Sequence, residues 1–150
     1  MNKIFLILSM LSAPLFFSQE KAELKIENNK NIEKPLNLTT KQIKLYNGRF
    51  LEFINALKSS DHAVMEGLLA DNAKKVVTDD VYKKLAADIN TGKKFEIIKT
   101  GYKPLMNGSN YPMIQYKYAD DKSSVPNEVI TAVFENDGKI LGIKPFKKMK

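Results

Sequence analysis

Few side chains in this sequence are of the types that carry out chemistry, and they form no catalytic pattern. His62 is the only histidine, and Asp61 precedes it. A histidine held by a carboxylate can act as a general acid or base. Neighbours in sequence at the start of a helix do not face each other, however. We therefore predict that His62 lies on the surface, and we assign no catalytic residue.

Two carboxylate pairs, Asp79-Asp80 and Asp120-Asp121, are candidate cation ligands. A hard cation takes six or more oxygen ligands, usually from a loop with ligands at alternating positions. Neither pair lies in such a loop. We predict that the first pair complements the positive end of a helix and that the second keeps a loop solvated. We therefore predict no metal site, and since no cofactor motif is present we predict no cofactor. The chain has no cysteine, so we also predict no disulfide.

Three amphipathic helices are expected in the first part of the domain. Thr39 and Gln42 form a capping box, and apolar residues then recur every three or four positions, which predicts a helix over 40–58. Gly48 in its middle suggests close packing against another backbone or a bend. A second, shorter helix follows a cap at Asp61, with Val64, Met65, Leu68 and Leu69 as its apolar face. Thr78 caps a third, whose buried stripe is Val81, Leu85 and Ile89.

Beyond Gly92 the apolar pattern changes to a period of two, which predicts strands. They are expected at about 95–102, 111–118, 128–135 and 139–143, with tight turns at Asn107-Gly108 and Asn136-Asp137-Gly138. In the second strand, alternation puts Ile114, Tyr116 and Tyr118 on one face. Helices segregated to one face of an antiparallel sheet give an α+β domain. The predicted fold is therefore three N-terminal helices packed on a curved antiparallel sheet of about four strands.

Two segments resemble parts of a known family. Residues 50–57 (FLEFINAL), followed by Ser60-Asp61 and a short helix, resemble the opening of cone-shaped NTF2-like domains. Residues 133–146 (VFENDGKILGIKPF) are similar to the end of small exported bacterial NTF2-like domains of unknown function. The resemblance implies a sheet that curves round the helices and leaves a conical pocket. Catalytic members place an acidic residue, a Tyr or a His in that cone, but no family catalytic motif is found here.

Aromatic side chains from the first helix and the strands would face each other in such a cone. Either they line a ligand pocket with tyrosine hydroxyls as polar handles, or they form ordinary core and cross-strand pairs. The pocket candidates are Tyr46, Phe50, Phe53, Tyr102, Tyr116, Tyr118 and Phe134, and Tyr111 belongs to the same aromatic set.

The N-terminus predicts export. A positive start at Lys3, an uncharged apolar run from Ile4 to Leu11 and a break at Pro14 follow the order of a cleavable signal peptide over residues 1–18. The uncharged stretch is shorter than the roughly 20 apolar residues of a membrane span. Residues 19–38 are expected to form a flexible polar leader, with a short edge strand at Ala22, Leu24 and Ile26 as the alternative. Residues 39–150 are expected to form one domain, periplasmic or extracellular.

The charge pattern argues against nucleic acid as a partner. The 150-residue chain carries 24 basic and 17 acidic residues, and Arg49 is the only arginine. Base and phosphate recognition depend strongly on arginine. The lysines are spread along the chain, with one cluster at Lys144, Lys147, Lys148 and Lys150 that could contact anionic lipid or glycan or simply be solvated.

We favour an exported, non-enzymatic binding or interaction module for an unknown small molecule or envelope protein. Two alternatives remain open at this point. One is a pocket enzyme of isomerase or hydratase type that uses Tyr and Asp, and the other is a subunit of an envelope complex with the leader or the lysine-rich tail as its contact. A homodimer is compatible with each of them.

Overall fold

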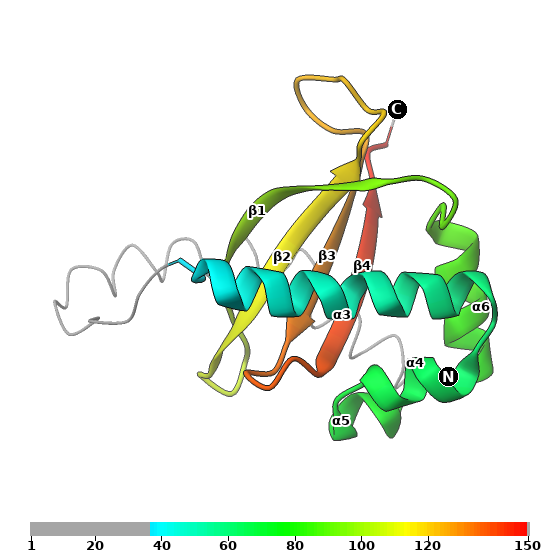
Figure 1. The fold of residues 1–150 in the computed structure, drawn as a ribbon, viewed down its shortest axis with the longest axis vertical. Coiled ribbons are helices and arrows are strands. Elements are labelled where there is room, and N and C mark those ends of the chain that lie inside the picture. The colour runs from blue at the N-terminus through cyan, green and yellow to red at the C-terminus, as the bar shows by residue number, and fades with distance from the viewer. Residues whose placement is uncertain (1–36, 150) are drawn as a thin grey trace, which may run out of the picture.

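The structure, a computed structural model, describes residues 37–149 as one α+β domain (Figure 1). The predicted signal peptide and most of the predicted leader therefore lie outside the described residues. Four helices precede four strands, which confirms the α+β prediction. The helices are α3 (Thr40–Lys58), α4 (His62–Leu68), α5 (Asp71–Lys74) and α6 (Asp79–Asp88), and the strands are β1 (Phe95–Pro104), β2 (Asn110–Tyr118), β3 (Glu128–Phe134) and β4 (Ile140–Lys147).

Helix α3 begins and ends at the predicted residues. Thr39 Oγ1 accepts a hydrogen bond from the backbone N–H of Gln42, and Gln42 Oε1 accepts one from the N–H of Thr39, which completes the capping box. Leu38, which we assigned to the leader, and Ile43 belong to the same core cluster, at the two positions of a hydrophobic staple. Gly48 contradicts the close-packing prediction, because no other part of the fold comes within 4 Å of the position that a Cβ would take there.

A compact arm of three short helices follows α3. Asp61 caps α4 by accepting a hydrogen bond from the N–H of Val64. The four-residue helix α5 was not predicted, so the described residues contain one helix more than the three expected from sequence. Its N-cap, Ala70, makes no side-chain hydrogen bond, so the usual start signal is missing. The N–H of Ala70 instead donates to the carbonyl of Ile140, which ties the arm to the start of β4.

The four strands form an antiparallel meander in the order β1-β2-β3-β4. Gly108 and Gly138, both with positive φ, lie in the two tight turns that were predicted, a conformation that glycine adopts without steric cost. On β2, the side chains of Ile114, Tyr116 and Tyr118 belong to the main core, as predicted. Strand β4 extends four residues beyond its predicted end and includes Pro145, which an edge strand tolerates.

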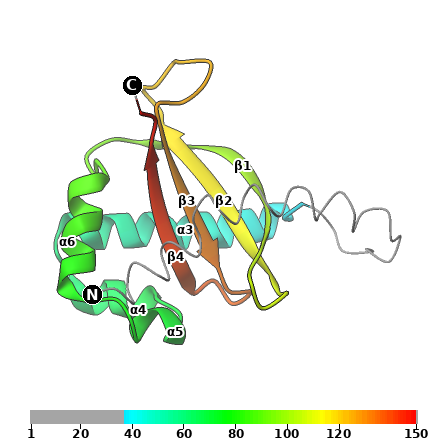
Figure 2. The same cartoon turned by 180° about the vertical axis from the view of Figure 1, so that it is seen from behind.

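The main core lies between α3 and the inner face of the sheet (Figure 1). Its largest fully buried side chains come from the helix and from β2 and β3. Figure 2 shows the outer face of the same sheet, which none of the described helices covers. A second, small cluster on that face is centred on Met113 and Val133, with Leu105, Tyr111 and Leu141 packed against it. Tyr111 therefore lies apart from the other aromatic residues.

Candidate functional site

The predicted pocket residues largely pack against one another. The ring of Phe50 on α3 stacks on that of Tyr116 on β2, with 3.9 Å between the ring centroids. Tyr46 stacks on Phe134 in the same way, at 5.0 Å. All four side chains are at most 1% exposed. These rings fill the space between helix and sheet, so their contacts are those of an ordinary aromatic core.

The tyrosine hydroxyls of this layer are used within the fold. Tyr46 donates a hydrogen bond to the carbonyl of Asn136 at 3.2 Å, and Tyr116 donates one to Asn47 Oδ1 at 3.1 Å. Burial raises the pKa of both hydroxyls, which therefore stay protonated. Tyr102, at the edge of the layer, accepts a 3.5 Å hydrogen bond from Gln42 Nε2. Phe53 and Tyr118, the other two of the seven predicted residues, border open spaces in the fold.

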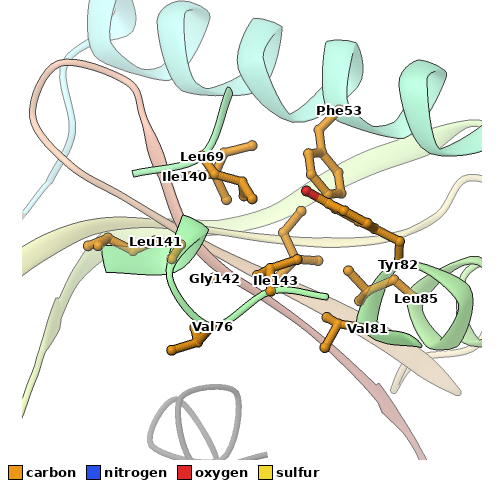
Figure 3. A pocket seen from close by; sticks show the side chains of 12 residues that line it. Phe53, Leu69, Val76, Val81, Tyr82, Leu85, Ile140, Leu141, Gly142 and Ile143 are labelled. Atoms are coloured by element: carbon orange, nitrogen blue, oxygen red, sulfur yellow. The ribbon is translucent and has the colours of Figure 1, made fainter. Parts of the chain in front are cut away.

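Phe53 borders a cavity of about 30 Å³ between α3, the helical arm and β4 (Figure 3). Figure 3 shows the side chains of Leu69, Val81, Leu85, Ile140 and Ile143 around it, with the Tyr82 ring alongside Phe53. The volume is about that of one water molecule, and a stable buried water needs two to four polar partners. The lining is almost entirely apolar, so this cavity is a packing defect and not a ligand site.

Tyr118 lines a larger hollow, of about 220 Å³, on the inner side of the sheet where α6 ends. The hollow opens between the last residues of α6, the end of β2, the start of β3 and the end of β4. It is lined by Ala87, Asp88, Tyr118, Glu128, Ile130, Pro145, Phe146 and Lys147. Binding sites for drug-sized ligands are typically some 300–1,000 Å³, so this hollow suits a compact ligand or a single side chain of a partner.

The Tyr118 hydroxyl is held in a fixed position at this hollow. It accepts a 2.8 Å hydrogen bond from the backbone N–H of Asn90, and Lys93 Nζ lies 5.2 Å from the centre of its ring. Burial raises the pKa of the hydroxyl; the Asn90 hydrogen bond opposes that shift only in part. A protonated phenol that accepts one hydrogen bond still has its own proton to donate.

Charged groups of both signs surround the rest of the opening. Glu128 Oε1 lies 3.1 Å from Lys147 Nζ across the β3–β4 pair. Asp88 Oδ2 lies 3.1 Å from Lys84 Nζ along α6. Phe146 also borders the hollow, but strand alternation turns its side chain to the outer face together with Lys144. The opening therefore presents a phenol and two ion pairs whose partners are partly exposed and can exchange for a ligand at modest cost.

His62 lies on the surface, as predicted, with half of its side chain exposed. Its Nδ1 is 3.1 Å from Asp79 Oδ1, so its carboxylate partner is Asp79 and not the adjacent Asp61, and its ring lies against Tyr82. Between residues 37 and 149, no group of three or more histidine or acidic side chains is arranged to hold a metal ion.

The second carboxylate pair organises the loop between β2 and β3. Asp121 accepts hydrogen bonds from the N–H groups of Ser123 and Asn127 at 3.0 and 2.8 Å. These bonds, foremost the one from Asn127, lower the pKa of Asp121 to about 2. Asp120 forms an ion pair with Lys93 at 3.0 Å. The pair was predicted only to solvate the loop, and it also fixes the shape of the loop.

Comparison of the chain with protein-family models, with curated proteins and with solved structures finds no match in any of the three. In the part of the chain that the structure describes, no helix has the length and apolar character of a membrane span. The site must therefore be interpreted from its own geometry.

Most residues of the hollow were not predicted from the sequence. Asp88, Glu128 and Phe146 come from three different elements: strand register brings β3 and β4 together, with Glu128 opposite Lys147 and Val129 opposite Phe146, and the packing of α6 adds Asp88. The available signal was the pattern Lys144-Pro145-Phe146-Lys147, which we took as the start of a basic tail. Extending the strand through the proline would have placed Lys147 opposite Glu128.

Proposed function

We propose that this protein is an exported, non-enzymatic binding module with an NTF2-like cone, and that the hollow at the end of α6 is its ligand site. One observation carries the proposal: in the described domain, aromatic rings along α3 fill the space against the inner face of the sheet, whereas a hollow of about 220 Å³ opens toward α6. The two breaks in strand register, at Ile97/Lys99 and Val133/Phe134, support a curved sheet, because bulges bend strands.

The lining defines the kind of ligand. A small ring or branched alkyl group fits against Tyr118, Ile130 and Pro145, and a charged or hydrogen-bonding group fits beside Glu128 and Lys147. An isolated compact molecule and a side chain of an envelope protein both have this chemistry. The volume of about 220 Å³ favours a compact group over a larger cofactor.

Titration of the isotope-labelled protein with small aromatic amines, aromatic carboxylates and neutral aromatic fragments tests the proposal. We expect saturable NMR shifts that cluster on residues of the hollow. Ala87→Phe should abolish them by filling the space, whereas Ala86→Phe, its exposed neighbour outside the hollow, should not. Shifts that are absent, or that survive in the Ala87→Phe protein, would rule out the hollow as the site.

A pocket enzyme of isomerase or hydratase type is the second candidate, favoured by the phenol of Tyr118 and the carboxylate of Glu128 in one hollow. It is the weaker proposal, because Glu128 is engaged by Lys147 and general base catalysis needs a carboxylate within reach of the substrate proton. Turnover of a bound fragment that is lost in both Tyr118→Phe and Glu128→Gln would establish the enzyme and overturn the binding module.

A further inference from the structure

The outer face of the sheet has an apolar half. Strand alternation and register place Met113 on β2, Val133 on β3 and Gly142 on β4 in one row across it. Tyr111, Leu105 and Leu141 pack around this row. Beyond them the same face is polar, with Gln115, Thr131 and Lys144 in the next row. An antiparallel sheet that faces water on one side is normally polar on that side.

No helix between residues 37 and 149 lies over this apolar half (Figure 2). The helices pack on the other side or at the β4 end. Contiguous apolar side chains on a sheet face gain free energy when another layer removes them from water, so this half is a candidate contact surface.

The chain itself supplies a segment of the right length and pattern. Eighteen residues, 19–36, lie between the predicted signal peptide and the described domain. Helix α3 starts beside β1 and β2 in both views (Figures 1 and 2). At about 3.3 Å per extended residue these residues span roughly 60 Å, against about 15 Å across four strands. Ala22, Leu24 and Ile26 alternate with charged residues, which gives an extended segment one apolar side.

We propose that residues 20–27 lie extended on the outer face of the sheet, with Ala22, Leu24 and Ile26 against the cluster of Met113 and Val133. The leader is then part of the folded domain, and the domain begins well before α3. This inference is independent of the proposed function, because the hollow lies on the inner face.

Spin-label NMR tests the contact directly, since a chain without cysteine accepts one label at a chosen site. The protein is recovered after export of the full precursor. A label at Lys144→Cys, on the outer face, should broaden the amide signals of residues 20–27. A label at Leu51→Cys, on the exposed side of α3, should leave them sharp. Signals that stay sharp with both labels overturn the proposal.

Two matched double variants test the apolar contact. Leu24→Asp with Ile26→Asp should abolish the broadening and increase the peroxide oxidation rate of Met113 several-fold, as read by peptide mass spectrometry. Asn28→Asp with Asn29→Asp adds the same charge outside the alternating segment and should change neither. Equal behaviour of the two variants contradicts the proposal. A second control mixes spin-labelled protein with isotope-labelled protein that carries no spin label. If broadening appears only between these two molecules, a second copy covers the outer face, and the proposal is wrong.

Discussion

The inner face of the sheet has two regions that differ in how well they are filled. Along α3, large rings from the helix and from β2 and β3 meet at stacking distance. Toward α6, the facing side chains are the smaller Ala73, Val76, Val81 and Leu85, and they leave a cavity of about 30 Å³ and, farther along, the hollow. In both regions a layer of helices covers the same sheet. The size of the side chains between helix and sheet therefore decides whether the space between them is filled as core or left as a pocket.

The difference is one of side-chain volume and not of fold. Aromatic rings bury some 150–250 Å² each and dominate the energetics of a core, whereas alanine and valine leave space that only a ligand or a void can occupy. Substitutions that change volume should therefore have opposite consequences in the two regions.

The largest effect is expected from Phe50→Ala. Phe50 is fully buried and contacts both Tyr116 and Phe95, so its truncation should lower the free energy of unfolding by about 3–5 kcal/mol. Urea unfolding followed by circular dichroism measures the loss. Leu51→Ala, one residue along on the exposed side of α3, should change stability by no more than about 0.5 kcal/mol. A loss of only about 1 kcal/mol for Phe50→Ala, below the range for a buried ring, would mean that the layer is loosely packed.

The next prediction compares the effect of added side-chain volume on stability in the two regions. Ala132 is fully buried between its register partners Ile114 and Ile143, so Ala132→Val should cost about 1–3 kcal/mol through overpacking. Val81 borders the small cavity, so Val81→Ile can place its extra methylene there and gain up to about 0.8 kcal/mol. Thermal unfolding of both variants decides the matter. Equal destabilisation would contradict the distinction between the regions.

A smaller effect is expected on the outer side of α3. Gly48 has open space around the missing side chain, so Gly48→Ala should stabilise the protein by about 0.4–1 kcal/mol through helix propensity and a less flexible unfolded chain. Gly138→Ala is the control. Gly138 has φ +98°, a conformation that residues with a Cβ rarely adopt, so this substitution should destabilise the protein. If Gly48→Ala also destabilises, α3 packs against something on its outer side.

The smallest effect concerns the loop beside the hollow, which is held by hydrogen bonds and not by burial. The folded-state pKa of Asp121 is lowered to about 2, against about 3.9 for an unperturbed aspartate. Its contribution to stability is therefore complete above about pH 4 and is lost as the pH falls through about 2. The amide signals of Ser123 and Asn127 should titrate with that midpoint, and Asp121→Asn should abolish the titration. A midpoint near the unperturbed value of about 3.9 would contradict the hydrogen bonds as the cause.

The sequence was sufficient for the elements that follow a local rule. The Thr39–Gln42 capping box placed the start of α3, and alternation placed Tyr116 and Tyr118 on the inner face, because both depend on near neighbours. The hollow could not be predicted in this way. It depends on Asp88 lying near Phe146, and on a strand that continues through Pro145, where the missing N–H suggested an end.

The space left between packed elements could not be predicted from the sequence either. Phe50 and Tyr118 both lie on regular apolar patterns, yet one ring is stacked at 3.9 Å and the other lines an opening. Only the residue opposite distinguishes them, and that residue comes from a distant part of the chain. Helix α5 was missed for a local reason, since Ala70 gives no capping signal.

The bond between the helical arm and β4 also sets an order of events in folding. Lys139 Nζ donates to the carbonyl of Gly67, 72 positions away, and Ala70 bonds to Ile140 beside it. Closing so long a loop is entropically unfavourable until other contacts have formed. The arm should therefore dock late, after the meander has assembled, and a chain still emerging from the ribosome should complete this contact only when its final strand is available.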